Sequence, residues 1–79
     1  MAYLYGAREE VVSKAAEEIS RMTGMRVGFQ NGYSLFDFPE FENFANGPKI
    51  LLVGLGTPRQ EFWTNDNAGR LGTTLAVTV

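Results

Sequence analysis

The feature that most limits the fold is an apolar run, K-I-L-L-V-G, at residues 49–54. Short uninterrupted apolar runs are typical of strands that are buried on both faces, as in parallel sheets covered by helices. Gly54 and Gly56 follow, and then Thr57-Pro58, a pattern that indicates a tight loop and the start of a helix. The run therefore predicts a parallel strand leading through a glycine loop into a helix.

The rest of the chain repeats this alternation of strand and helix. Apolar residues recur at helical spacing over about 8–23, and Gly24 suits a left-handed helix cap. The predicted strands are 2–5, 25–30, 49–54 and 73–79, and the predicted helices are 8–23, a short one from near Pro39 to a turn at 46–48, and 57–69. Right-handed crossovers then predict a three-layer, Rossmann-like βαβαβαβ unit with a parallel sheet. For the strand order we expect 2-1-3-4, by analogy with flavodoxin-like or half-Rossmann sheets.

Composition excludes several classes of function. The chain has 79 residues, a formal net charge of −2, and neither cysteine nor histidine. It therefore has no disulfide, thiolate nucleophile or imidazole base, and the charge argues against nucleic-acid binding. No apolar run is long enough for a membrane span, and the absence of cysteine fits a cytoplasmic protein. We expect one domain over 1–79, and one that is truncated, because the chain stops inside a predicted strand.

The candidate site is the segment G-L-G-T-P-R-Q-E-F-W at residues 54–63. Ligands of parallel sheets bind at the carboxyl ends of the strands, which here are 6–8, 30–33 and 54–60. Glycines let the backbone approach a ligand closely, and a helix N-terminus favours phosphate. Arg59 could add a charge-assisted hydrogen bond. In this interpretation Thr57 is the N-cap and Pro58 is the first helical residue.

Each of these residues also has a purely structural interpretation. Thr57-x-x-Gln60 has the spacing of a capping box, in which the two side chains bond to each other's backbone N–H groups. Phe62 and Trp63 are better explained as core aromatics than as stacking platforms. The two aspartates, Asp37 and Asp66, form no paired-carboxylate or metal pattern, so we expect turn or surface positions for them and no metal or cofactor.

Several motifs together resemble one known family. They are L-Y-G-A at 4–7, N-G-Y at 31–33, N-G-P-K-I-L-L-V-G-L-G-T-P-R-Q-E-F-W at 46–63 and the closing L-A-V-T-V. In this register the chain resembles the WecG/TagA/CpsF family of bacterial glycosyltransferases, which act in teichoic acid, enterobacterial common antigen and capsule synthesis. The resemblance covers nearly the whole chain, as the C-terminal-half core of such an enzyme.

The resemblance implies a reaction and a set of site residues. Members of the family transfer N-acetylmannosamine or its uronic acid from a UDP-sugar to a lipid-linked acceptor, with inversion. The position of Gln60 lies in their active-site pocket and that of Tyr33 lies close to the nucleotide. The resemblance therefore implies that Gln60 is catalytic and that Tyr33 binds substrate. The pocket-lining backbone would come from Gly54, Gly56, Thr57, Pro58 and Arg59.

The departures from the family are equally informative. The family's candidate catalytic aspartate lies in an N-terminal half that this sequence does not contain, and its membrane-facing C-terminal appendage is also missing. Lys49 replaces a common aspartate, and Ser34 stands where an aromatic residue usually follows the tyrosine. We therefore expect weak UDP-sugar binding without catalysis, and membrane contact only in full-length relatives. The alternative is a non-enzymatic binding or scaffold domain. We also expect a homodimer through the closing strand, the alternative being a stable monomer in which that strand lies centrally in the sheet.

Overall fold

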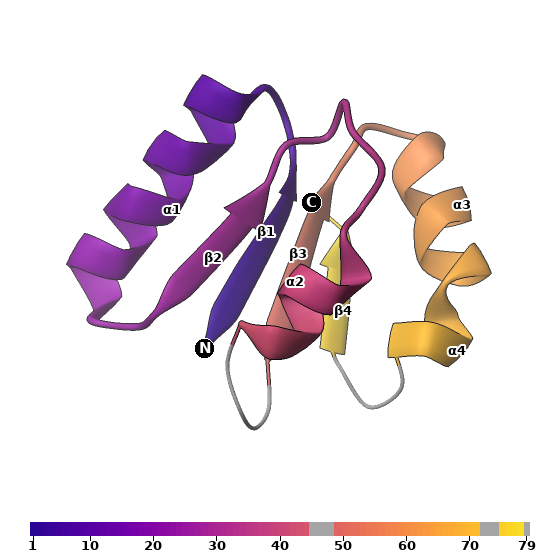
Figure 1. Ribbon diagram of the computed structural model, residues 1–79. Helices are drawn as coiled ribbons and strands as arrows, with labels where there is room; N and C mark the ends of the chain where they lie inside the picture. The colour runs from indigo at the N-terminus through magenta and orange to yellow at the C-terminus, as the bar shows by residue number, and fades with distance from the viewer. Residues whose placement is uncertain (45–48, 72–74, 79) are drawn as a thin grey trace.

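The computed structural model describes residues 1–44, 49–71 and 75–78. Its elements are β1 (Ala2–Gly6), α1 (Glu9–Thr23), β2 (Val27–Gln30), α2 (Phe38–Asn43), β3 (Ile50–Gly54), α3 (Arg59–Asp66), α4 (Ala68–Leu71) and β4 (Leu75–Thr78). All strand pairs are parallel, in the order β2-β1-β3-β4 (Figure 1). The α/β class and the strand order predicted from the sequence are confirmed.

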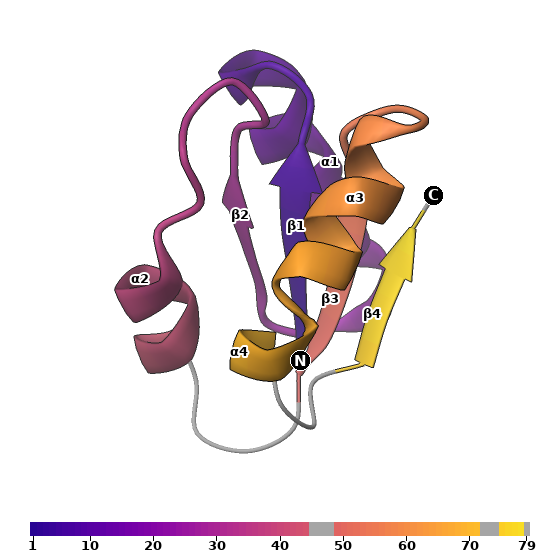
Figure 2. The same ribbon diagram turned by 90° about the vertical axis from the view of Figure 1, so that its right-hand side faces the viewer.

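Helices cover both faces of the sheet, which gives the predicted three layers (Figures 1 and 2). The face toward α2, α3 and α4 is rich in rings, and we call it the aromatic face. Its buried residues are Tyr3, Tyr5, Phe36, Phe41, Leu51, Val53 and Leu71, with Phe38, Phe44, Leu55, Trp63 and Ala76 packed around them. Tyr3 meets three other rings edge-on, at centroid distances of 5.2–6.1 Å.

The opposite face, toward α1, is the aliphatic face. Its core consists of Leu4, Val12 and Ala16, with Ala15, Ile19, Val27, Phe29 and Leu52 packed against them. The helix α1 packs on β1 and β2. Register places Leu75 beside Ile50 and Val77 beside Leu52, so both β4 residues project from this face. Leu75 is 60% exposed, and no element within the described residues covers it.

The helix α1 follows the prediction closely. Val12 and Ala16 are its buried residues, and Glu9 and Glu10 occupy its first turn, where carboxylates interact favourably with the helix dipole. It ends at Gly24, which has a φ of 72° and donates its N–H to the carbonyl of Ser20 at 2.9 Å. The left-handed glycine cap predicted from the sequence is therefore confirmed.

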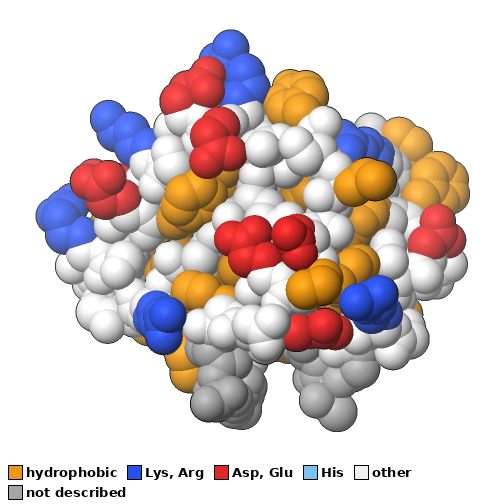
Figure 3. Space-filling view, viewed as in Figure 1, with side chains coloured by type: hydrophobic (Ala, Val, Ile, Leu, Met, Phe, Trp, Pro, Cys, Tyr) orange, Lys and Arg blue, Asp and Glu red, His pale blue; other side chains and the backbone are white. Residues whose placement is uncertain are grey.

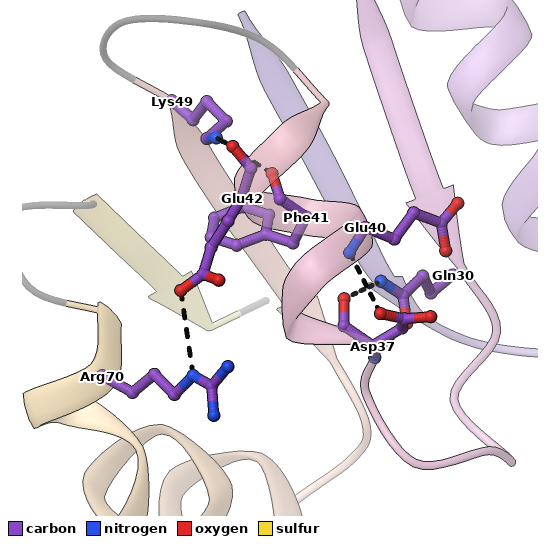
Figure 4. A network of polar contacts seen from close by, with 7 residues as sticks. All are labelled: Gln30, Asp37, Glu40, Phe41, Glu42, Lys49 and Arg70. Carbon is purple, nitrogen blue, oxygen red and sulfur yellow. Dashed lines mark hydrogen bonds and ion pairs between the residues drawn. The ribbon is translucent and has the colours of Figure 1, made fainter.

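The short helix α2 is held at both ends by side chains (Figure 4). Asp37 is its N-cap, because the backbone N–H of Glu40 donates to Asp37 Oδ1 at 3.0 Å. At the other end, Lys49 Nζ donates to the carbonyls of Phe41 and Glu42 at 2.9 and 3.2 Å. The lysine that departs from the family pattern thus satisfies carbonyls that a helix end leaves unpaired.

The third predicted helix differs from the prediction in two ways. Its N-cap is Pro58 and not Thr57, and the first helical residue is Arg59. It also ends at Asn67 instead of Gly69, and α4 follows as a separate turn. At this break Asn67 donates both its backbone N–H and its side-chain Nδ2 to the carbonyl of Trp63, at 3.1 and 2.8 Å. A side chain that competes for helical carbonyls favours termination.

The two adjacent aromatic residues of α3, Phe62 and Trp63, also differ in burial. Trp63 packs on the core as predicted, but Phe62 is 64% exposed, so its predicted core position is wrong. Adjacent residues of a helix point about 100° apart, and only one of the two can face the sheet. The predicted turn at 46–48 and residues 73, 74 and 79 of the closing strand lie outside the described residues.

Candidate functional site at the strand ends

The three strand ends named from the sequence meet at one edge of the sheet. In the order β2-β1-β3-β4, the chain leaves β1 toward β2 on one side and returns to β3 on the other. This reversal between β1 and β3 is the switch point at which open parallel sheets bind ligands. A cavity of about 240 Å³ lies there, lined by Ala7, Gly32, Tyr33, Gly54, Leu55, Gly56 and Arg59. We call it the switch-point cavity.

Backbone atoms are closely packed beside this cavity. A Cβ built on Gly6 would lie 2.3 Å from the carbonyl oxygen of Gly54, and one built on Gly32 would lie 2.9 Å from Gly6 Cα. The N–H of Gly32 donates to the carbonyl of Ala7 at 2.8 Å, and Ala7 has a φ of 60°. Glycines are required where strands β1 and β3 and the β2 loop converge, because any side chain at Gly6 or Gly32 would collide with backbone.

The loop after β2 forms one wall and is held at both ends. The N–H of Tyr33 donates to Asn31 Oδ1 at 2.9 Å, and Asn31 Nδ2 donates to Glu9 Oε1 at 3.1 Å. At the far end Gln30 Oε1 accepts the N–H of Asp37 at 2.7 Å, while Gln30 Nε2 donates to the carbonyl of Asp37 at 2.9 Å (Figure 4). The loop is therefore fixed at both ends, although the side chain it presents, Tyr33, is 77% exposed.

The opposite wall is the loop between β3 and α3, and Gln60 closes it. Gln60 Oε1 accepts the N–H of Gly56 at 3.1 Å, and the Gln60 N–H donates to the Gly56 carbonyl at 2.9 Å. Gln60 is only 6% exposed. The capping interpretation is thus right about the kind of contact and wrong about the partner, which is Gly56 and not Thr57. The Thr57–Pro58 peptide bond is cis.

Arg59 supplies the positive charge of the cavity and is the one cationic side chain among the described residues that line it. The N-terminus of α3 offers few free backbone N–H groups to an anion. Pro58 has no N–H, and the N–H groups of Gln60 and Phe62 already donate to the carbonyls of Gly56 and Pro58. The phosphate site predicted at the helix N-terminus therefore has fewer backbone donors than the sequence indicated, and an anion would depend mainly on Arg59.

The phenol of Tyr5, on β1, is buried on the aromatic face. Burial raises the pKa of Tyr5, and the charge of Arg59 together with a hydrogen bond from it partly opposes that rise. Tyr5 therefore remains a neutral hydroxyl at physiological pH, so it can both donate and accept a hydrogen bond.

A family model described as Glycosyl transferase WecG/TagA/CpsF family matches residues 1–79. This chain belongs to the WecG/TagA/CpsF glycosyltransferase family. No curated protein and no solved structure is matched by it. In the described part of the chain, no helix is both long enough and apolar enough to cross a membrane.

In this WecG/TagA/CpsF chain the site residues named from the sequence fall into two groups. Tyr33, Gly54, Gly56 and Arg59 line the switch-point cavity. Thr57 and Pro58 are exposed beside it, and Gln60 is buried behind its loop. Three lining residues were not singled out from the sequence, namely Ala7, Gly32 and Leu55. The signal for all three was available, because they lie within the strand ends 6–8, 30–33 and 54–60.

A second and larger hollow, of about 590 Å³, lies beside β2. Glu9, Asp37 and Glu40 contribute to its lining, and acidic side chains gather near the middle of this face, over α2 and the loop before it (Figure 3). Negative charge disfavours a diphosphate, so the larger volume is the poorer candidate for a nucleotide-sugar. Within the described ranges no cluster of three or more acidic side chains could hold a metal ion.

Proposed function

We propose that this chain is the nucleotide-sugar-binding core of a glycosyltransferase of bacterial cell-surface polysaccharide synthesis, with a donor of the UDP-N-acetylmannosamine type. One observation carries the proposal. A cavity at the switch point of the sheet combines closely packed glycine backbone, an exposed tyrosine on a fixed loop and one arginine. Family membership supports the reaction class.

Each wall of the cavity suits a different part of such a donor. The Arg59 guanidinium can form charge-assisted hydrogen bonds with the diphosphate. The Tyr33 ring, exposed beside it, can stack on the uracil base. The volume of about 240 Å³ is below the roughly 300–1,000 Å³ of complete ligand sites, so only part of the donor is enclosed. We therefore expect millimolar affinity for UDP, which is about −4 kcal/mol.

We also propose that the chain alone does not catalyse transfer. An inverting transfer needs a base for the acceptor hydroxyl. Neither a carboxylate nor an imidazole is among the described residues that line the cavity. The amide of Gln60 cannot serve as a base, and its oxygen already accepts the Gly56 N–H. Incubation with UDP-N-acetylmannosamine and a lipid-linked acceptor should release no UDP above background, and turnover by the purified chain would contradict this.

An NMR titration with UDP tests the binding proposal. The amides of Tyr33 and Gly56 should shift, and Arg59→Gln should weaken binding at least about tenfold, since a charge-assisted hydrogen bond contributes roughly 1.5–3 kcal/mol. Arg70→Gln is the matched control, because Arg70 lies on α4 and pairs with Glu42 at 3.8 Å. If both amides stay unmoved at saturating UDP, the proposal fails and the non-enzymatic scaffold interpretation is favoured.

Gln60 allows a second test, which separates a structural role from ligand contact. Gln60→Ala removes the acceptor of the Gly56 N–H and should lower the free energy of unfolding by about 1 kcal/mol. If Gln60 only holds the loop, the UDP-induced shifts survive in this variant. Gln60→Glu keeps an acceptor oxygen and serves as the control. Loss of UDP binding in Gln60→Ala at unchanged stability would instead assign Gln60 to the ligand.

A further inference from the structure

The strand β2 (Val27–Gln30) is one edge of the sheet. In the described part of the chain it pairs with β1 and with no other strand, in the order β2-β1-β3-β4. An edge strand leaves a row of backbone N–H and C=O groups without a strand partner, and these groups can pair with another chain. The sequence of β2, V-G-F-Q, contains neither a charged residue nor a proline, which commonly prevent such pairing at sheet edges. The edge of β2 is therefore open to an added strand.

The hydrogen bonds to β1 show which backbone groups of β2 face outward. The carbonyl of Arg26 accepts the N–H of the first residue of β1 at 3.2 Å. Consecutive residues of a strand direct their backbone groups to opposite sides, so Gly28 and Gln30 also bond toward β1. The N–H and C=O groups of Val27 and Phe29 consequently point away from the sheet, where an added strand would lie.

A hollow flanks this edge on each face of the sheet. On the aliphatic face a hollow of about 630 Å³ lies between β2 and α1, and Val27, Phe29 and Ala16 contribute its apolar lining. On the aromatic face lies the hollow of about 590 Å³, which Gly28 and Gln30 line from the strand. Side chains of an added strand alternate between the two faces, so they would enter the two hollows in turn. The edge thus offers main-chain hydrogen bonds together with space for alternate side chains, the two requirements for recognition of an extended peptide.

The two hollows differ in charge. Glu9, Asp37 and Glu40 line the hollow on the aromatic face, and no lysine or arginine is among the described residues that line it. In the described structure the carboxylates of Asp37 and Glu40 form no ion pair. The hollow on the aliphatic face is lined by one acid and one base, Glu17 and Arg21. Only the hollow on the aromatic face therefore favours a cationic side chain.

We propose that the edge of β2 binds an extended peptide of a partner protein as an added strand, with lysine or arginine at alternate positions. Residues of the peptide that lie opposite Gly28 and Gln30 place their cationic side chains in the acidic hollow, and their neighbours place apolar side chains against α1. A second copy of this chain is a poorer occupant, because the described residues of its edge strands, V-G-F-Q and L-A-V-T, include no cation. The inference concerns a different surface from the switch-point cavity and does not rest on the proposed function.

Hydrogen exchange of the backbone amides tests the added strand. In the free chain Val27 and Phe29 should exchange rapidly, whereas Gly28 and Gln30, which bond to β1, should exchange slowly. The probe is a seven-residue peptide, blocked at both ends, in which lysine alternates with valine. When it occupies about nine-tenths of the chain, exchange at Val27 and Phe29 should slow by about tenfold, since only the free fraction still exchanges. The same peptide with every backbone nitrogen methylated is the control and should give no protection, because it lacks the N–H donors of a strand.

Two results would overturn the added strand. One is a lysine peptide that leaves exchange at Val27 and Phe29 unchanged, whether or not it binds elsewhere on the chain. The other is exchange at these two residues that becomes slower as the concentration of the free chain rises, which would show that a second copy occupies the edge.

The charge of the partner is tested by a matched peptide in which glutamate replaces lysine. It should bind about tenfold more weakly, because an attraction at the acidic hollow becomes a repulsion of similar size. Glu40→Lys should reverse this preference. Glu61→Lys changes the net charge equally at an exposed position of α3 and should retain the preference for lysine. Equal binding of the two peptides, or the same reversal in Glu61→Lys, would overturn the basic partner.

Discussion

The two faces of the sheet are stabilised in different ways. The aromatic face is covered by three helices of six, eight and four residues, which meet the sheet through interlocking rings. The aliphatic face is covered over β1 and β2 by one helix of 15 residues. Helices shorter than about 12 residues are marginal in isolation, so the three short ones depend on the sheet they cover. Aromatic packing therefore holds the side of the molecule that carries the Arg59 wall.

The sharpest test of this difference uses two neighbours on β3. Leu51 is fully buried on the aromatic face, and Leu52 is partly buried on the aliphatic face. Leu51→Ala should lower the free energy of unfolding by about 3–5 kcal/mol and Leu52→Ala by about 1–2 kcal/mol, because the cost grows with the cavity that remains. Urea denaturation measures both. Equal losses would show that the two faces are packed equally well.

Space on the aromatic face is the next point to test. A Cβ on Gly28 would lie 2.6 Å from Tyr3 Cε2 and 2.8 Å from Phe44 Cε1. Gly28→Ala should therefore destabilise the chain by about 1–3 kcal/mol through overpacking. Gly69→Ala, in α4, has no atom within 4 Å of its added Cβ and should instead stabilise by up to about 1 kcal/mol. If Gly28→Ala leaves the thermal unfolding midpoint unchanged, the rings of Tyr3 and Phe44 move aside at little energetic cost.

Alkaline pH should lower the stability of the folded chain through the two buried tyrosines of the aromatic face. Burial raises the pKa of Tyr3 and of Tyr5 above the usual 10.0. In the unfolded chain these phenols lose their protons near that value while the folded chain keeps them, so stability is complete below about pH 10 and falls as pH rises toward the folded pKa. Urea midpoints measured from pH 8 to 11 should show the fall. Tyr3→Phe and Tyr5→Phe should each reduce it, and an unchanged fall in both variants would assign it to other groups.

The smallest effect on stability is expected at β4, where α1 does not cover the aliphatic face. Leu75→Lys should change the stability of the monomer by less than about 0.5 kcal/mol, as for most exposed positions. We propose that two copies associate here, because β4 is an edge strand whose described residues carry no charge to oppose pairing. Sedimentation at several concentrations should then show a dimer that Leu75→Lys disperses. A single species near 8.8 kDa at high micromolar concentration would contradict the proposal.

Much of this fold could be predicted because its signals are local. The apolar run at 49–54, the helical spacing over 8–23 and Gly24 each determine an element within a few residues, and the crossover rule then makes the sheet parallel. The order of the strands was expected only by analogy with flavodoxin-like sheets. The convergence of the strand ends at the site follows from the same rule. The exposure of Phe62 was not predictable in this way, since it depends on which side of α3 meets the sheet. The break at Asn67 was missed because it depends on the hydrogen bonds of Asn67 to the carbonyl of Trp63, which the helical spacing does not reveal.

The site was harder to predict than the fold, because its contacts join distant residues. The amide of Gln30 bonds to Asp37 across the β2 loop, and Tyr5 reaches Ser34 from another strand. No spacing rule covers such pairs. The partner of Gln60, the N–H of Gly56, was missed for a related reason. A capping box requires Thr57 to be the N-cap, whereas α3 has Pro58 at that position and begins at Arg59.

The glycine contact at the strand ends also bears on how such a site can change over evolutionary time. Mutation replaces side chains, but Gly6, Gly32 and Gly54 meet through backbone, and at Gly6 and Gly32 even one added methyl would collide with neighbouring main chain. Substitutions at Gly6 and Gly32 are therefore not tolerated in this part of the cavity. Adaptation to a different sugar or nucleotide would have to come from Tyr33, Leu55 and Arg59, which project from the loops around it. The same converged strand ends could thus persist unchanged through a succession of substrates.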